Sequence, residues 1–245
     1  MVLSPIYGVE TISGEIRTRR WGREEVMSSR VGNYSKPRVL KTQSRPGGTS
    51  SEVLSPSAKI FYMFKRETKL AQNTFLYLKN YLSKDDRVLD IGTGNGLVAN
   101  LIREHIGAQV KGIDVININH TEHKTLIFNG KDIPFENNYF SVSICCFVLH
   151  HAYNQIELLK DMKRVTRSTI IILEDTPQTF LDKILGFIHK FPSTLRYHSS
   201  RVNFKTDDEW KGFFRDNGLI LKKVLKIEKR DPTYPISRRM YVLEK

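Results

Sequence analysis

The chain has 245 residues, of which 40% are hydrophobic and 10% aromatic, enough for one well-buried α/β core and too few for two full-sized domains. Its formal net charge of +13 suits a nucleic acid, an anionic membrane surface or an acidic substrate, and equally an ordinary solvated surface with scattered Lys and Arg. No stretch approaches the ~20 apolar residues that span a bilayer and no secretory signal is evident, so we expect a cytoplasmic protein.

Residues 1–57 differ in composition from the rest of the chain. They are rich in Ser, Gly, Pro and Arg, show no sustained hydrophobic period, and hold nine Lys and Arg residues against five acidic ones. We interpret this segment as a disordered basic N-terminal arm, followed by one domain over residues 58–245. An organelle transit peptide is the alternative, and the arm's glutamates count against it.

A helical period of apolar residues begins at Ser57 and continues to Leu82. The short apolar run Arg87–Ile91 follows and ends at glycines, which predicts a strand. A second helical period covers Leu97–Ile106, where Gly107 is placed to stop it. Val110–Asp114 then predicts a second strand.

Further strands are predicted at Thr125–Asn129, Val142–Leu149 and Thr169–Glu174, with a helix at Gln155–Val165 between the last two. A strand, a helix and a strand at this spacing indicate right-handed βαβ units and a parallel sheet covered on both faces. The apolar run Ile144–Leu149 fits a central strand that is buried on both sides.

The pattern changes after Glu174. Residues 180–189 predict an amphipathic helix, and a loop leads on to Asn203. Thr206 is placed to cap the next helix, with Glu209 three positions later as in a capping box. Two last strands are predicted at 219–229 and 239–243, joined by a loop that contains Pro232 and Pro235.

Three glycines stand at the turn between the first predicted strand and the helix after it, in the segment Asp90-Ile-Gly92-Thr-Gly94-Asn-Gly96. Glycines there let a ligand lie against the main chain. A dinucleotide fingerprint needs its third glycine at the sixth position, where this chain has Leu97, so the spacing disfavours a pyrophosphate ligand.

Two carboxylates flank this turn. Asp90 before the turn would repel a pyrophosphate but suits the ammonium and sulfonium groups of S-adenosylmethionine. Asp114 ends the second predicted strand, 20 residues after Gly94, and a carboxylate there can accept hydrogen bonds from both ribose hydroxyls. The turn therefore predicts an S-adenosylmethionine site.

Residues 60–245, which contain this turn, resemble the class I S-adenosylmethionine-dependent methyltransferases, particularly the ubiquinone/menaquinone-biosynthesis group (methyltransferase type 11 domain). Val88–Gly96 is similar to the family's first motif, Gly112–Asp114 to its acidic ribose position, and Lys131–Phe135 to a motif whose acid contacts the adenine amine. Tyr139–Val142 followed by Phe147–His151 resembles the fourth-strand signature. One departure is Ser141, because the family usually has Asp there.

The resemblance and the pattern together imply an α/β fold: a Rossmann-like, doubly wound, mostly parallel seven-stranded sheet with an antiparallel C-terminal hairpin. Residues 176–205 then form a helical lid insertion over the acceptor. Ile133 and Phe135 are expected to sandwich the adenine. The predicted cofactor-binding residues are Asp90, Gly92, Thr93, Gly94, Asn95, Gly96, Asp114, Val115, Asp132, Ile133 and Phe147.

Candidate catalytic residues close the fourth and fifth predicted strands, at the sheet edge where α/β proteins bind ligands. His150 or His151 is either a general base or a residue that shapes the pocket mouth. Glu174 and Asp175 either orient an acceptor or cap the following segment. We name His150, His151 and Asp175 as catalytic candidates and predict no metal site, because no third ligand stands at matching spacing.

The expected reaction is transfer of the sulfonium methyl group to a small-molecule acceptor by in-line displacement. The alternative acceptor is RNA or protein, and the positive net charge favours RNA of these two. Against RNA, Phe147–His150 stands where many amino-methylating nucleic-acid enzymes carry an Asn-Pro-Pro-Tyr type motif. A catalytically silent binding module is a further alternative, although the chain keeps both the glycine turn and the ribose acid.

Overall fold

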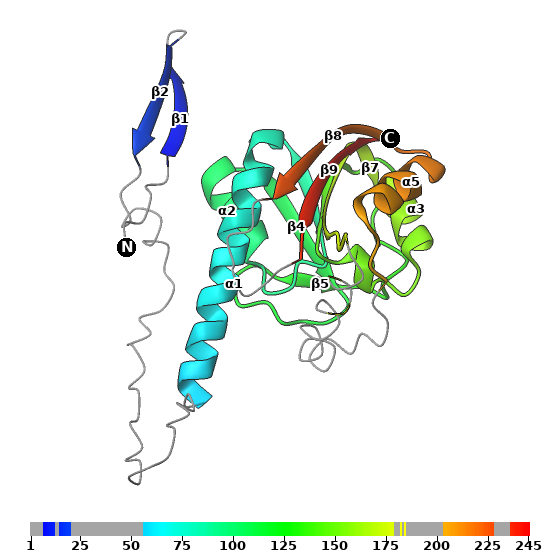
Figure 1. Cartoon of the computed structure of the whole chain (residues 1–245), viewed down its shortest axis with the longest axis horizontal. Helices are drawn as coiled ribbons and strands as arrows, with labels where there is room; N and C mark the ends of the chain where they lie inside the picture. Colours follow the sequence, from blue (N-terminus) through cyan, green and yellow to red (C-terminus); the bar gives the residue numbers. More distant parts are fainter. Residues whose placement is uncertain are drawn as a thin grey trace. The chain divides into compact units, whose positions relative to one another are not determined.

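The structure, a computed structural model, describes residues 7–12, 15–20, 56–178, 182, 184, 203–227 and 236–245, with side chains from residue 66 onward (Figure 1). The chain divides into two units, residues 1–64 and 65–245, and each is described by itself. Most of the predicted lid (176–205), including nearly all of its helix, lies outside the described residues. So does the loop that contains Pro232 and Pro235.

The first unit contains a hairpin that the sequence did not predict. Strands β1 (Tyr7–Ile12) and β2 (Glu15–Arg20) pair antiparallel, with Ile12 opposite Glu15, so two residues connect them. Both strands are rich in β-branched residues, but no alternation of apolar and polar residues marks them. The sequence predicted a disordered arm over residues 1–57. Residues 1–6, 13–14 and 21–55 lie outside the described residues, and for them the disorder stays a prediction.

The second unit is built on a seven-stranded sheet of order β5-β4-β3-β6-β7-β9-β8. Strands β3 to β7 run parallel and β9 pairs antiparallel with both β7 and β8. The strands are β3 (Arg87–Ile91), β4 (Gln109–Asp114), β5 (Thr125–Ile127), β6 (Phe140–Cys146), β7 (Thr166–Asp175), β8 (Ile220–Ile227) and β9 (Arg238–Glu244). The predicted fold class is confirmed.

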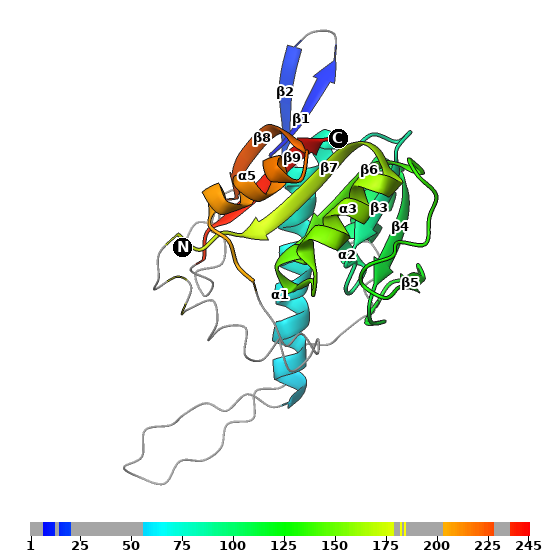
Figure 2. The same cartoon turned by 90° about the vertical axis from the view of Figure 1, so that its right-hand side faces the viewer.

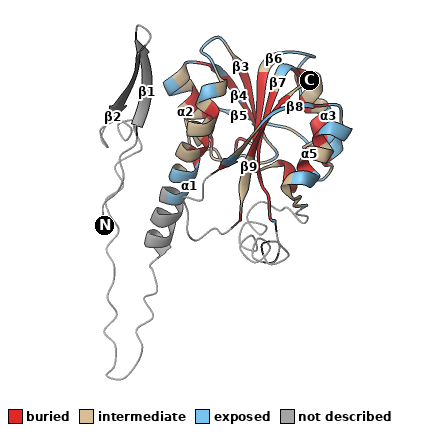
Figure 3. Ribbon diagram, turned by 45° about the horizontal axis from the view of Figure 1, so that its top comes forward, coloured by how far each residue is buried: buried red, intermediate tan, exposed pale blue. Residues whose placement is uncertain are grey.

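Helices cover both faces of this sheet (Figure 3). Side chains of α1 (Pro56–Leu78) and α2 (Leu97–Ile106) pack on one face, where Leu78 and Ile102 are fully buried. On the other face, α3 (Gln155–Val165) and α5 (Asp207–Asp216) bury Leu159 and Trp210. The short 3₁₀ helix η1 (Lys79–Tyr81) continues α1.

Local signals in the sequence set the helix ends. Gly107 ends α2 in the left-handed conformation, with a φ of 80°. Asn154 caps α3 by accepting hydrogen bonds from two backbone amides of the first turn. At α5, Thr206 and Glu209 form both bonds of the capping box, which confirms that prediction.

The fourth predicted strand ends three residues earlier than its apolar run indicated. β6 stops at Cys146, because Phe147 adopts a φ of 60° that no strand can hold. The remaining apolar residues form the 3₁₀ helix η2 (Leu149–His151), and Leu149 is buried in the core. The run is apolar there because of packing and not because of strand pairing.

Two connections on one side of the sheet contain no helix. Loops 115–124 and 128–139 join β4 to β5 and β5 to β6, as Figure 2 shows. Parallel strands are usually joined by helices that cover the sheet. As a result, Val115, Leu126 and Ile127 are exposed beside the β5 edge. Among the described helices, none is long and apolar enough to cross a membrane.

Candidate cofactor and acceptor site

The glycine turn lies at the carboxyl end of β3 and is bonded to the end of β4. The backbone amides of Gly92 and Thr93 both donate to the carbonyl of Ile113, at 2.8 and 3.1 Å. The turn therefore sits where the two neighbouring parallel strands end, which is the edge at which doubly wound sheets bind nucleotides.

Asp114 holds this turn as well as ending β4. One carboxylate oxygen accepts a hydrogen bond from the Gly94 amide at 2.8 Å, and the other accepts one from the Val115 amide at 2.7 Å. Each carboxylate oxygen has two acceptor sites, so Asp114 keeps the capacity to accept ribose hydroxyls while it fixes the turn. Val115 is exposed beside it.

The three glycines of the turn differ in what a side chain at each position would meet. A Cβ at Gly92 would lie 2.3 Å from Val148, and a Cβ at Gly96 would lie 2.5 Å from Asn119, so both positions are needed for close packing. A Cβ at Gly94 would meet nothing nearer than a backbone oxygen at 3.9 Å. The space above Gly94 is thus an open cradle that a side chain would fill, as a cofactor lying against the main chain requires.

Asp90 is a buried carboxylate, 3% exposed, just before the turn. The Thr93 hydroxyl donates to it at 2.8 Å. Burial raises the pKa of Asp90 to about 6, against the lowering effect of the Thr93 bond, and the nearby charge of Asp114 raises it further. Two carboxylates around one turn fit a cationic ligand, and the ammonium and sulfonium groups of S-adenosylmethionine are such charges.

Two other predicted residues of the turn have side chains that serve the turn itself. The Thr93 side chain is buried against Asp90. The Asn95 side chain accepts from the Leu97 amide at 3.2 Å and donates to Glu67 of α1 at 3.2 Å. Their main chain, not their side chains, is what the turn presents to a ligand.

The structure separates the members of the predicted adenine motif. Asp132 is exposed and accepts a hydrogen bond from Asn129 at 2.7 Å. Ile133 is 2% exposed in the core, and its amide donates to Asp161. Phe135 packs edge-on against Phe140, the first residue of β6, at the opposite end of the strand from the glycine turn. Both side chains thus pack against protein neighbours, and the expected sandwich of adenine by Ile133 and Phe135 stays a prediction.

Ser141, the departure from the family pattern, also lies away from the turn. Its hydroxyl donates to Asp86 at 2.7 Å and accepts from the Arg87 amide at 3.0 Å. It joins the beginnings of β3 and β6, so this position does not touch the glycine turn.

The carboxyl ends of β6 and β7 and the amino end of β9 meet around Phe147. Its amide donates to the Leu173 carbonyl at 2.7 Å, and the Arg238 guanidinium lies 5.0 Å from its ring centre. Arg238 also forms an ion pair of 3.1 Å with the buried Asp175. Asp175, predicted as catalytic, is thus engaged with a cation at the rim of the site.

The two histidines of η2 differ in their surroundings. His150 is 1% exposed, and its Nδ1 atom is hydrogen-bonded to Glu174, the penultimate residue of β7. The Phe204 ring stacks on it with centroids 5.0 Å apart. His151 is only partly buried, and its ring centroid lies 4.1 Å from that of His150.

Sequence reasoning missed the residues that hold η2. Asn203 donates from its amide to the His150 carbonyl at 2.9 Å. The buried Gln155 side chain donates to the carbonyls of Leu149 and Asn203, at 3.0 and 3.2 Å, and accepts from Lys205. Residues 203–205 are thereby fixed to the histidine segment. No local motif marks such a contact between residues about 50 positions apart.

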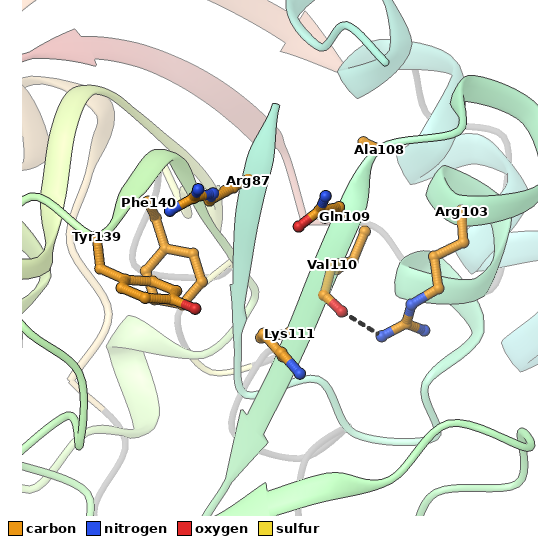
Figure 4. Close-up of a pocket in the computed structure, with 8 residues that line it drawn as sticks. All are labelled: Arg87, Arg103, Ala108, Gln109, Val110, Lys111, Tyr139 and Phe140. Carbon is orange, nitrogen blue, oxygen red and sulfur yellow. Dashed lines mark hydrogen bonds between the residues drawn. The ribbon is translucent and has the colours of Figure 1, made fainter. Parts of the chain in front are cut away.

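A pocket of about 270 Å³ lies at the opposite end of the strands from the glycine turn, around the amino ends of β3 and β4 (Figure 4). Arg87 extends toward Tyr139 on one side, and Arg103 bonds to the Val110 carbonyl at 2.7 Å on the other. None of the described residues that line it is a carboxylate. The lining residues are Arg87, Arg103, Ala108, Gln109, Val110, Lys111, Tyr139 and Phe140. This basic pocket is not the place where the predicted site residues gather.

The strand order and the acidic glycine turn at the end of β3 define the class I fold of the S-adenosylmethionine-dependent methyltransferases. Residues 63–223 match the family model described as a methyltransferase domain, and the chain belongs to that family. A search of curated protein sequences found no match.

Solved structures with the same fold include several methyltransferases. One is an S-adenosylmethionine-dependent methyltransferase from Thermotoga maritima, described as a possible histamine N-methyltransferase, with a TM-score of 0.56 and 14% identity over 76% of this chain and 97% of that one. Another, from Methanosarcina mazei, has a TM-score of 0.53 and 17% identity over 69% and 96%. The geranyl diphosphate C-methyltransferase of Streptomyces coelicolor, solved with S-adenosylhomocysteine, has a TM-score of 0.54 and 12% identity over 72% and 81%.

At these identities the solved structures establish the fold, and the family match establishes the class of protein. The chain is an S-adenosylmethionine-dependent methyltransferase, and S-adenosylmethionine is its cofactor. The particular similarity to the ubiquinone/menaquinone group stays a prediction.

Proposed function

We propose that this methyltransferase acts on a small-molecule acceptor held over the carboxyl ends of β3, β6 and β7. One contact carries the proposal: Val148, two residues before His150, packs so closely on Gly92 that a Cβ there would lie 2.3 Å from it. This contact brings the segment that contains His150 against the glycine turn. S-adenosylmethionine, when bound, supplies the electrophilic sulfonium methyl group, and the protein contributes alignment and exclusion of water.

On the cofactor side, charge and hydrogen-bonding capacity assign the roles. Asp90 would face the cationic methionine end, Asp114 the ribose hydroxyls, and the exposed Asp132 the adenine amine. The open cradle above Gly94 would let the cofactor lie against the main chain. Phe147, between β6 and Arg238, would close the site toward the acceptor.

On the acceptor side, His150 or His151 would take a proton from an oxygen or nitrogen nucleophile. His150 is fixed by Glu174 and Phe204, whereas His151 is the more exposed of the two. Asp175 would act through Arg238, whose guanidinium it holds at the rim of the site. A role of both histidines in shaping the pocket is the alternative.

The position of the basic pocket favours a small molecule over RNA. Arg87 of β3, Lys111 of β4 and Arg103 of α2 line this pocket near the amino ends of the two strands, whereas the glycine turn lies at the carboxyl ends. Phosphates bound there would not lead a nucleic acid into the site. The predicted lid over residues 176–205 and the cytoplasmic location stay predictions.

The test is a methylation assay with isotope-labelled S-adenosylmethionine, in which the chain is offered a metabolite extract or total RNA in separate reactions. The proposal expects label in small molecules, identified by mass spectrometry, and loss of that label in the Gly94→Ala variant. Label confined to nuclease-sensitive material, falling steeply with added salt, would overturn it in favour of RNA. Binding of the cofactor with no labelled product in either reaction would favour a silent binding module.

A further inference from the structure

Glu174 is a carboxylate with no access to water. It is the penultimate residue of β7 and is 0% exposed. Both hydrogen bonds of its side chain in the described part of the chain go to one residue. Oε2 is bonded to His150 Nδ1, and Oε1 accepts from the His150 amide at 3.4 Å. Within the described residues no Lys or Arg forms an ion pair with it. A buried carboxylate needs a hydrogen-bonded partner, and here that partner is His150.

This contact decides where the proton of a neutral imidazole lies. A carboxylate can only accept, so Nδ1 must carry the hydrogen that it donates to Glu174. The lone pair of the ring then lies on Nε2. Without such a partner a neutral histidine is not held in this tautomer.

Other contacts prevent the ring and its backbone from turning. Phe204 stacks on the imidazole at an interplanar angle of 21°, with centroids 5.0 Å apart. The His150 carbonyl accepts from the Asn203 amide at 2.9 Å, and Gln155 ties both neighbouring segments together. The ring of His150 is therefore held by Glu174 through a hydrogen bond and by Phe204 through its face.

We propose that Glu174 is a positioning residue, which holds His150 with its proton on Nδ1 so that Nε2 receives the proton of the methyl acceptor. This inference rests on the proposed function. The acceptor it fits carries an ionisable O–H or N–H group, such as an alcohol, a phenol or an amine.

The atoms and charges balance in this scheme. As the acceptor oxygen or nitrogen forms its bond to the methyl carbon, the bond from sulfur to that carbon breaks and its electron pair stays on sulfur. The acceptor proton passes to Nε2, either during or after the attack. Glu174 and the doubly protonated His150 then carry no net charge together, which a buried site favours over an isolated cation. The proton leaves to solvent when the product does.

Two substitutions separate the hydrogen bond from the charge. Glu174→Gln keeps an acceptor oxygen of the same reach but carries no charge, whereas Glu174→Leu removes both. Glu244→Gln, at a partly buried residue of β9 paired with Lys222, is the control for loss of one negative charge. Folding of each variant is checked by its thermal unfolding.

The first readout needs no acceptor. Nitrogen-15 NMR of histidine-labelled protein, with His150 assigned through His150→Gln, reports which ring nitrogen carries the proton. We expect the Nδ1–H tautomer in the wild type and in Glu174→Gln, and its loss in Glu174→Leu. An Nε2–H tautomer in the wild type would overturn the inference, and would do so even if the acceptor proves to be RNA.

The second readout is transfer to the acceptor found in the extract assay. In Glu174→Gln we expect kcat to fall about 10- to 100-fold, a part of the total that a general base contributes, with the KM for S-adenosylmethionine unchanged. The control should keep the wild-type kcat. Glu174→Leu, which loses the hydrogen bond as well as the charge, should lower kcat further. A folded Glu174→Leu protein with wild-type kcat would contradict the positioning role while leaving the proposed function intact.

Discussion

The carboxylate of Asp114 accepts a hydrogen bond of 2.8 Å from the backbone amide of Gly94. The residue proposed to bind the ribose therefore also shapes the turn that is proposed to hold the cofactor. The sequence alone predicts a ligand-binding role for Asp114, whereas the structure shows that its carboxylate also holds the backbone of the turn. Substitution of Asp114 should affect both the cofactor affinity and the free energy of unfolding.

Asp114→Ala is expected to weaken S-adenosylmethionine binding by about 10- to 100-fold, since hydrogen bonds to a charged group contribute about 1.5–3 kcal/mol. It should also lower the stability of the cofactor-free protein, because the Gly94 and Val115 amides lose their acceptor. Isothermal titration calorimetry and chemical denaturation measure the two effects. Asp216→Asn removes a charge from an exposed carboxylate and should change neither.

Substitution of Asp90 should have the opposite effect on the free energy of unfolding from substitution of Asp114. Its pKa is raised by burial from 3.8 to about 6, so ionised Asp90 destabilises the cofactor-free fold. A shift of this size corresponds to at most about 3 kcal/mol. Asp90→Asn is therefore expected to raise the free energy of unfolding at pH 7 while weakening binding of the cationic cofactor.

The sign of the pH dependence follows from the raised pKa of Asp90. The folded state holds its proton up to about pH 6 and the unfolded state only to about pH 4, so stability is lost as the pH rises through this window. The gain from Asp90→Asn should be full above pH 7 and vanish near pH 4. Cofactor affinity of the wild type should fall as the pH drops below about 6. Equal stability of the two proteins at pH 8 would contradict this account.

Gln155 joins the histidine segment to the residues before α5. Gln155→Met fills similar space but leaves the Leu149 and Asn203 carbonyls and the Lys205 ammonium without this partner. We expect a loss of about 1–3 kcal/mol in the free energy of unfolding and a lower kcat, with unchanged affinity for S-adenosylmethionine. Gln178→Met, at an exposed glutamine, is the control. A drop in cofactor affinity as large as that of Asp114→Ala would show that Gln155 acts on the turn instead.

Much of the architecture could be predicted from the sequence because its signals are local. The helical periods, the glycine that ends α2 and the capping box at Thr206 all depend on residues within a few positions of one another. The end of β6 could not be predicted, since Cys146, Phe147 and Val148 are all apolar and only the backbone of Phe147 differs. The β1–β2 hairpin lacks the alternation by which strands are recognised.

The site was predictable in part for the same reason. Gly92 to Gly96 and Asp114 form a recognisable spacing, and the structure brings them together. Ile133 shares its motif with Asp132, yet its side chain turns into the core, because a linear motif does not say which face each residue presents. The contacts of Glu174, Gln155 and Phe204 depend on how β7 and the segment before α5 approach η2, which no local pattern encodes.

The central claim is that the glycine turn binds S-adenosylmethionine, and calorimetric titration of two matched alanine variants tests it most directly. Gly94 and Gly107 both have positive φ, of 56° and 80°, and a Cβ at either would meet its nearest neighbour at 3.9 Å. Each substitution should therefore cost about 1–2 kcal/mol of stability through backbone strain. The account predicts that Gly94→Ala loses S-adenosylmethionine affinity at least about 10-fold while Gly107→Ala binds as the wild type does, whereas equal affinities in the two variants would contradict it.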